Sequence, residues 1–205
     1  MAEKNKKTDI DIDFPDRNKA VSVLDHTPAS IIKNNHLEKH NTGVYFHLVP
    51  TDPLTNLSSV DYQVAESNGW FKIDLLNVSV YEQISNEKHL LDLMGQEINW
   101  DMFQMPDFTT NLIHLGNHSE LVKDLKPTNI NELAVVLALI RPGKRHLIDR
   151  CKRYGFNSIQ TEIWEETNDG SYYFKAAHSF SYAMLVKVHA CLLIEQAMNE
   201  PEASL

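Results

Sequence analysis

Glycine and cysteine are both scarce in this chain of 205 residues, which contains 7 glycines and 2 cysteines. With 42% hydrophobic residues and so little glycine, the chain can bury a sizeable core, either as one domain or as one domain with a helical appendage. Cys151 and Cys191 lack the spacing of metal ligands. We therefore expect free thiols in a reducing cytoplasm, and not a disulfide or a zinc site.

Long apolar runs are also missing. No stretch reaches the roughly 18 apolar residues that a membrane-spanning helix needs. The opening segment Met1 to Lys7 is polar and lacks the apolar core of a signal peptide. The longest apolar run, Leu133 to Ile140, is expected to be a buried helix. The sequence thus predicts a cytoplasmic protein with no membrane partner.

Positive charge is in deficit, since the formal net charge is -9. An acidic protein starts at a disadvantage in binding nucleic acid, because much of that affinity comes from Lys and Arg neutralising phosphates. The distribution of charge softens this objection. Between Arg141 and Arg153 the chain carries six basic residues against the single Asp149. This block is interpreted either as a phosphate-facing surface or as a solvated helix face.

Three carboxylates do stand out, because they alternate with apolar residues in the segment from Thr8 to Phe14. Side chains on a strand point to alternate faces, so Asp9, Asp11 and Asp13 are predicted to share one face. Same-face neighbours lie about 6.6 Å apart at Cα, close enough for their carboxylates to converge on a divalent cation. The alternative is an acidic edge strand whose charges discourage aggregation.

A second segment, Gly69 to Leu76, places Lys72 and Asp74 at a period of two inside an apolar strand. Both are predicted to share one face, with Phe71, Ile73 and Leu75 on the core face. A carboxylate on a buried strand needs a partner. If this strand lies beside the first, Asp74 joins Asp11 and Asp13 in a three-carboxylate metal site, and Lys72 can meet an anionic group.

Such a set of carboxylates suits phosphoryl and nucleotidyl transfer. Two divalent ions about 3.5 to 4 Å apart stabilise both the attacking and the leaving oxygen of an in-line displacement. Magnesium takes oxygen ligands and needs only one or two carboxylates besides phosphate oxygens and water. The residue types therefore favour Mg²⁺ over zinc.

These segments resemble the bacterial replicative DNA polymerase III alpha subunit, a family C DNA polymerase. The run Asp9 to Phe14 resembles the first palm motif of the family, and Phe71 to Leu76 resembles the second. Further matches follow in family order along most of the chain. They are a weaker turn match at 40–44, a stretch from 121 to 143 that ends in Arg141-Pro142-Gly143, and a His-Ser segment at 178–183.

The resemblance implies a fold, a reaction and a set of partners. The expected fold class is α/β (α+β), with a polymerase beta-like nucleotidyltransferase palm sheet, packed helices and a helical C-terminal part. The implied partners are a DNA primer-template and a deoxynucleotide triphosphate, with Mg²⁺ as cofactor. The implied catalytic and metal-binding residues are Asp11, Asp13 and Asp74, and the implied substrate-binding residues are Lys72, Arg141 and His178.

The chain also departs from the family. The Gly-Arg-Gly-Ser type motif that precedes the first aspartates is missing, the stretches at 13–40 and 143–178 are shorter, and Ala176 replaces a lysine beside the His-Ser pair. One interpretation is a split polymerase, whose remainder is a second polypeptide, acting in DNA replication. The alternative is a noncatalytic protein, derived from a polymerase, that binds DNA or a replisome protein. The small size favours a phage or other mobile element.

The rest of the sequence predicts the domain limits, the strands and the helices. A flexible N-terminus (1–7) precedes a palm-like domain (8–115) and a helical remainder of palm and fingers (116–205). Strands are predicted at 8–14, 43–49, 60–64 and 70–76. Helices are predicted at 17–24, 29–39, 79–94 and 176–199, together with one that opens with a capping box formed by Asn129 and Glu132 and ends near Ile140. A hairpin is predicted from 158–164 and 172–174.

Most of the histidines form no recognisable zinc site. Their spacing is irregular, so each is expected to be a surface histidine or a hydrogen-bonded core histidine. This group comprises His26, His36, His40, His114, His118, His146 and His189.

Overall fold

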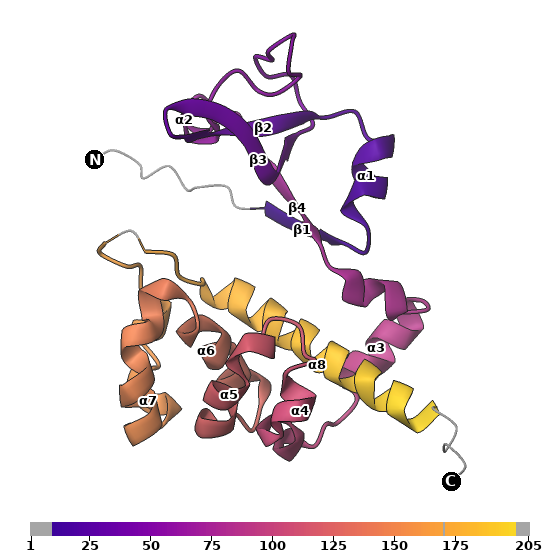
Figure 1. Cartoon of the computed structure of the whole chain (residues 1–205), viewed down its shortest axis with the longest axis vertical. Coiled ribbons are helices and arrows are strands. Elements are labelled where there is room, and N and C mark those ends of the chain that lie inside the picture. The colour runs from indigo at the N-terminus through magenta and orange to yellow at the C-terminus, as the bar shows by residue number, and fades with distance from the viewer. Residues whose placement is uncertain (1–9, 170, 200–205) are drawn as a thin grey trace. The chain divides into compact units, whose positions relative to one another are not determined.

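A computed structural model describes residues 10–169 and 171–199, so the predicted flexible N-terminus and Asp9 lie outside the described residues. The chain divides into two compact units, the first ending at Gln83 and the second beginning at Ile84 (Figure 1). The first contains a four-stranded mixed sheet and the second is helical. The coarse prediction of a mixed α/β (α+β) fold is therefore confirmed.

The sheet has the strand order β1-β4-β3-β2 (Figure 1). Strand β1 (Ile10–Phe14) pairs in parallel with β4 (Ile73–Asn77). Strand β3 (His36–Tyr45) runs antiparallel to both β4 and β2 (Thr27–Lys33). The predicted strands at 8–14 and 70–76 thus become neighbours, although β2 and β3 separate them in sequence.

The helices of the first unit are short. Helix α1 (Arg17–Val23) contacts β1 and β4, and α2 (Tyr62–Ser67) contacts β2. A single turn of 3-10 helix, η1 (Ser79–Gln83), follows β4. The expected start of a helix near Arg17 is confirmed, because the Asp16 side chain caps α1 by accepting from the Asn18 and Lys19 amides.

One buried cluster of the first unit consists of Ala29, Tyr45 and Ala65, with Val49, Val60 and Trp70 packed against it. Other buried apolar residues of the unit include Val44, Leu75, Val78 and Val80. Of the residues predicted for the core face, Leu75 is 1% exposed, whereas Phe71 is 41% exposed. Strand β1 lies at one edge of the described sheet, so only one neighbouring strand covers it.

Two predictions for the first unit are wrong. The predicted helix at 29–39 is instead the hairpin of β2 and β3, in which Lys33 pairs with His36 across Asn34 and Asn35. Both asparagines have positive φ, 50° and 63°, as a two-residue hairpin turn of type I′ requires. The predicted strand at 60–64 is largely helix α2, because the Asp61 carboxylate accepts from the Gln63 amide and caps it.

The second unit is built from helices (Figure 1). The expected helix at 79–94 is split into η1 and α3 (Glu87–Gly95). The remaining α-helices are α4 (Pro106–Thr109), α5 (Ser119–Leu125), α6 (Ile130–Leu139), α7 (Ile148–Tyr154) and α8 (Ala176–Asn199). Short 3-10 helices lie among them at Trp100–Gln104, Gly116–His118, Pro142–Leu147, Phe156–Ile159 and Glu162–Trp164.

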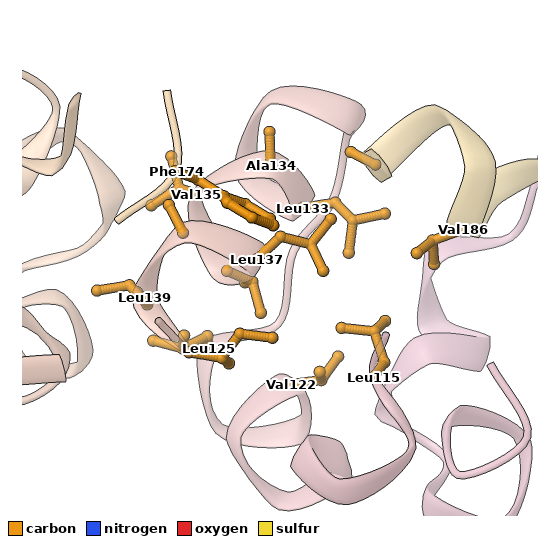
Figure 2. Packing of buried hydrophobic residues seen from close by; sticks show 14 of the residues in the cluster. Leu115, Val122, Leu125, Leu133, Ala134, Val135, Leu137, Leu139, Phe174 and Val186 are labelled. Carbon is orange, nitrogen blue, oxygen red and sulfur yellow. The ribbon is translucent and has the colours of Figure 1, made fainter. Parts of the chain in front are cut away.

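Helix α6 forms the centre of the second unit, and every residue from Leu133 to Leu139 is buried. Figure 2 shows several of these side chains, among them Leu133, Leu137 and Leu139, together with Val122 of α5 and Val186 of α8. The predicted N-cap is confirmed, since the Asn129 Oδ1 accepts from the Glu132 amide at 3.0 Å, whereas the Glu132 carboxylate accepts from the Thr128 amide at 2.7 Å and not from the Asn129 amide of an ideal capping box. The expectation of a buried helix at 133–140 is thus confirmed.

The predicted hairpin at 158–164 and 172–174 is wrong. Residues 156–159 and 162–164 are 3-10 helices, and 172–174 form no strand. Asp169 does make a turn, because its Oδ1 accepts from the Ser171 amide at 2.9 Å, but the turn joins irregular segments.

Helix α8 is long and apolar enough to cross a membrane, judged by length and composition alone. It nevertheless packs within its own unit, against α3 and α6. The buried Ser179 hydroxyl donates to the Ala134 carbonyl oxygen of α6 at 2.6 Å. These contacts are what a helix in the core of a globular unit makes.

Candidate functional site

Two carboxylates face each other across the parallel pair of β1 and β4. Asp11 is the register partner of Asp74, and Asp13 is the partner of Leu76. Residues paired in register point to the same side of a sheet, and neighbouring strands lie about 4.8 Å apart. Asp11, Asp13 and Asp74 therefore share one face of the first unit, as the sequence analysis predicted for adjacent strands.

Asp74 is buried, with 9% of the residue exposed, and both of its carboxylate oxygens have partners. Lys72 Nζ forms an ion pair with Oδ2, and the two side chains are only 17% and 13% exposed. The Thr42 hydroxyl donates to Oδ1 at 2.8 Å. These contacts offset the cost of removing the carboxylate from water. The side chains of Lys72 and Asp74, which were predicted to share one face, thus form an ion pair.

Thr42 reaches Asp74 because β3 bulges at this point. Pro28 pairs with Val44 and Ser30 pairs with Lys39, so the segment 40–43 of β3 lies where β2 has only Ala29. Extra residues in one strand leave backbone donors without ladder partners and re-aim side chains. Two of these donors, the amides of Gly43 and Thr42, donate to His40 Nδ1 at 2.9 and 3.3 Å.

These hydrogen bonds define the charge state of His40. Burial lowers the pKa of His40, and the nearby positive charge of Lys72 lowers it further. A neutral imidazole whose Nδ1 accepts two amide hydrogens carries its proton on Nε2. The separation of 3.7 Å between His40 Nδ1 and Asp74 Oδ1 is therefore not an ion pair. The imidazole instead holds the backbone of the bulge.

Gly43 is the register partner of Asp74 on the other side of β4. A Cβ atom at this position would lie 2.7 Å from Lys72 Cδ and 3.0 Å from His40 Nδ1. Glycine therefore allows the lysine stem and the imidazole to pack directly against the β3 backbone. The Lys72–Asp74 pair depends on this space.

Asp13 has its own partner. The Tyr81 hydroxyl, from the turn after β4, donates to Asp13 Oδ2 at 3.4 Å. Loss of hydration raises the pKa of Asp13, and the Tyr81 hydrogen bond opposes part of that increase. The same environment raises the pKa of Tyr81, chiefly through burial and then through the negative charge of Asp13.

The donor set of this face fits a hard divalent cation in chemical type. Carboxylate oxygens are the ligands that Mg²⁺ prefers, and it needs only one or two of them when phosphate oxygens and water complete its shell. Within 10–169 and 171–199, no group of three or more Asp, Glu, His or Cys side chains is arranged to hold a metal by itself. Lys72 occupies one oxygen of Asp74, so a cation there requires the ammonium group to move.

Arg141 and His178 lie in the second unit. The Arg141 guanidinium carbon lies 3.8 Å from the centre of the Phe174 ring, a cation–π contact. Burial lowers the pKa of Arg141. His178 is in the first turn of α8 and is partly buried. The acidic residues belong to the first unit, so the phosphate-binding role of Arg141 and His178 stays a prediction.

Sequence reasoning missed the parts of the site that come from β3 and η1. The sequence places His40 among the scattered histidines and assigns no role at the acidic face to Thr42 or Tyr81. One signal was the resemblance noted above for residues 40–44, a weaker one, to a turn of the polymerase family that has a histidine and a glycine at corresponding positions. No protein-family model matches the chain, and no curated protein matches it.

Proposed function

We propose that the first unit is a nucleotidyltransferase palm of the polymerase beta-like type, related to family C DNA polymerases and acting in DNA replication. The observation that carries this proposal is the parallel pairing of β1 and β4. It sets Asp11 opposite Asp74, with Asp13 on the same face. Carboxylates from two neighbouring strands are what a palm needs to add a deoxynucleotide to a primer 3'-hydroxyl.

In this proposal Asp11, Asp13 and Asp74 would hold Mg²⁺. When bound, Mg²⁺ supplies Lewis-acid stabilisation of the attacking and leaving oxygens. Burial raises the pKa of Asp13, and the Tyr81 hydrogen bond opposes part of that increase by favouring the ionised form that a cation requires. Asp74 has two donors, the Lys72 ammonium and the Thr42 hydroxyl, which hold its carboxylate on this face.

Lys72 has a second function in the proposal. An ammonium that neutralises Asp74 is available to a triphosphate once a cation takes its place on the carboxylate. The Tyr62 ring lies beneath the same ammonium, with 5.4 Å from Nζ to the ring centre, and can retain it during such a movement.

Arg141 and His178 are further proposed phosphate-binding residues and belong to the second unit. Within the basic block at 141–153, Lys144 is buried and donates to the Glu162 carbonyl oxygen at 2.6 Å. Lys152 Nζ donates to Asp124 Oδ2 at 2.6 Å, so both ammonium groups have partners within the second unit.

A primer-extension assay tests the proposal directly. The purified chain should extend a primer in the presence of template, deoxynucleotide triphosphates and Mg²⁺. Asp11→Ala should abolish extension while the fold is retained, which circular dichroism checks. Asp25→Ala is the matched control, because Asp25 is an exposed carboxylate of the same unit outside the acidic face. Equal extension by Asp11→Ala and the parent chain would refute the metal assignment.

A second candidate is a noncatalytic protein, derived from a polymerase, that binds DNA or a replisome protein. The observation in its favour is that both oxygens of Asp74 already have partners within the chain. In that case the chain should bind a primer-template, measured by fluorescence anisotropy, without extending it. Extension that appears only after a second polymerase polypeptide is added would instead identify a split enzyme.

A further inference from the structure

Thr42 is unusual in that its hydroxyl, its amide and its carbonyl group each have a partner in a different part of the site. The hydroxyl donates to Asp74 Oδ1 at 2.8 Å, and the amide donates to His40 Nδ1 at 3.3 Å. The carbonyl oxygen accepts from Arg17 Nη2 at 3.4 Å. A side chain whose backbone is held on both sides has little freedom to turn away from its acceptor.

The Thr42 hydroxyl has one hydrogen to donate, and two acceptors lie near it. His40 Nδ1 lies 3.5 Å from Thr42 Oγ1, whereas Asp74 Oδ1 lies at 2.8 Å. The carboxylate is both nearer and charged, and the imidazole nitrogen already accepts from two amides. The hydrogen bond therefore goes to Asp74.

The bulge that presents Thr42 is also tied to the end of β4. Arg17, which reaches the Thr42 carbonyl oxygen, donates its own amide to Asn77 Oδ1 at 2.9 Å. Thr42 and Asp74 are thus linked twice, once through their side chains and once through Arg17 and the end of β4. The branched Thr42 side chain adds stiffness, because a second heavy atom on Cβ restricts χ1.

We propose that Thr42 is a positioning residue for Asp74: its hydroxyl fixes the orientation of the carboxylate on the acidic face. The inference rests on the proposed function, which gives Asp74 a divalent cation to bind. Partners that orient a ligating carboxylate typically contribute 10–100-fold to metal affinity. Thr42 would act through its hydrogen bond to Asp74.

The test uses the full chain and three variants. Thr42→Val keeps the shape and removes the donor, and Thr42→Ser keeps the donor. Thr51→Val is the matched control, because this exposed hydroxyl of the same unit bonds only to the Val49 carbonyl oxygen among the described contacts. Mn²⁺ affinity, measured by isothermal titration calorimetry, should fall about 10–100-fold in Thr42→Val. It should stay close to the parent value in Thr42→Ser and Thr51→Val.

A second measurement needs no metal. NMR relaxation of the Asp74 side-chain carbons should show a lower order parameter in Thr42→Val than in the parent, and recovery in Thr42→Ser. An equally ordered Asp74 in Thr42→Val, or unchanged Mn²⁺ affinity in that variant, would overturn the role of Thr42. If neither the parent nor any variant binds Mn²⁺, the proposed function fails instead. The order parameters then still decide whether Thr42 holds Asp74.

Discussion

The Lys72–Asp74 pair offers a quantitative test, and Lys72→Met is the perturbation. Methionine retains the apolar stem and removes the ammonium group from a pair whose side chains are 17% and 13% exposed. Removing one partner of a buried ion pair costs about 3–5 kcal/mol. Asp74 keeps the Thr42 hydrogen bond at 2.8 Å, so the lower end of that range applies. We therefore expect Lys72→Met to lower the free energy of unfolding of the first unit by about 3 kcal/mol.

A double-mutant cycle separates the pair from the packing of its members. Asp74→Asn should cost less than Lys72→Met, because the Lys72 ammonium can turn to the Tyr62 ring or to water. The double variant should lower the free energy of unfolding by less than the sum of the losses in the two single variants. We expect a coupling free energy of about 2 kcal/mol, within the range for residues in contact.

Hydrogen exchange of the β4 amides is the appropriate assay, because it reports the opening free energy of the first unit by itself. The control is Lys33→Met. Lys33 Nζ lies 4.0 Å from Glu38 Oε2, and those side chains are 47% and 52% exposed, so this variant should lose less than about 1 kcal/mol. A coupling for Lys72 and Asp74 as small as that of an exposed pair would refute the reasoning.

Two further predictions concern Gly43 and His114. Gly43→Ala should reproduce much of the β4 destabilisation of Lys72→Met in the same exchange assay, because the new Cβ would lie 2.7 Å from Lys72 Cδ; unchanged exchange would contradict this. Burial, followed by the charge of Arg141, lowers the pKa of His114 from 6.5 to about 4. The unfolded chain therefore binds more protons between these values, and the stability of the second unit should fall by up to about 3 kcal/mol as pH drops from 6.5 to 4. His114→Asn, which tolerates the positive φ of 63°, should reduce that slope in urea unfolding followed at several pH values, and an identical slope would exclude His114 as its source.

The sequence predicted what depends on local periodicity. The alternation of Asp11 and Asp13 with apolar residues identified β1, and the apolar run with its capping box identified α6. The placement of Asp74 beside Asp11 followed from assuming that the two strands are adjacent, and the register now supplies that adjacency. Periodicity itself gives no information about which strands pair.

The errors have identifiable physical causes. The prediction of a helix at 29–39 conflicts with two local features, the β-branched Ile31 and Ile32 and the Asn34-Asn35 turn, which favours a hairpin. The contribution of Thr42 could not be derived, because the bulge that presents it depends on how β2 and β3 pair. A short turn motif reveals the residue types but not the acceptor that each one reaches.

The edge position of β1 has a consequence for how the acidic face is assembled. Among the described strands, β1 is held only by β4, and β2, α2 and β3 come between them in sequence. Closing that long loop costs chain entropy, so this contact is expected to be among the last that the first unit forms and the first that it loses. Detachment of one short strand would then separate Asp11 and Asp13 from Asp74 while the β2–β3 hairpin stays intact. A growing polypeptide would complete the acidic face only after β4 has been synthesised.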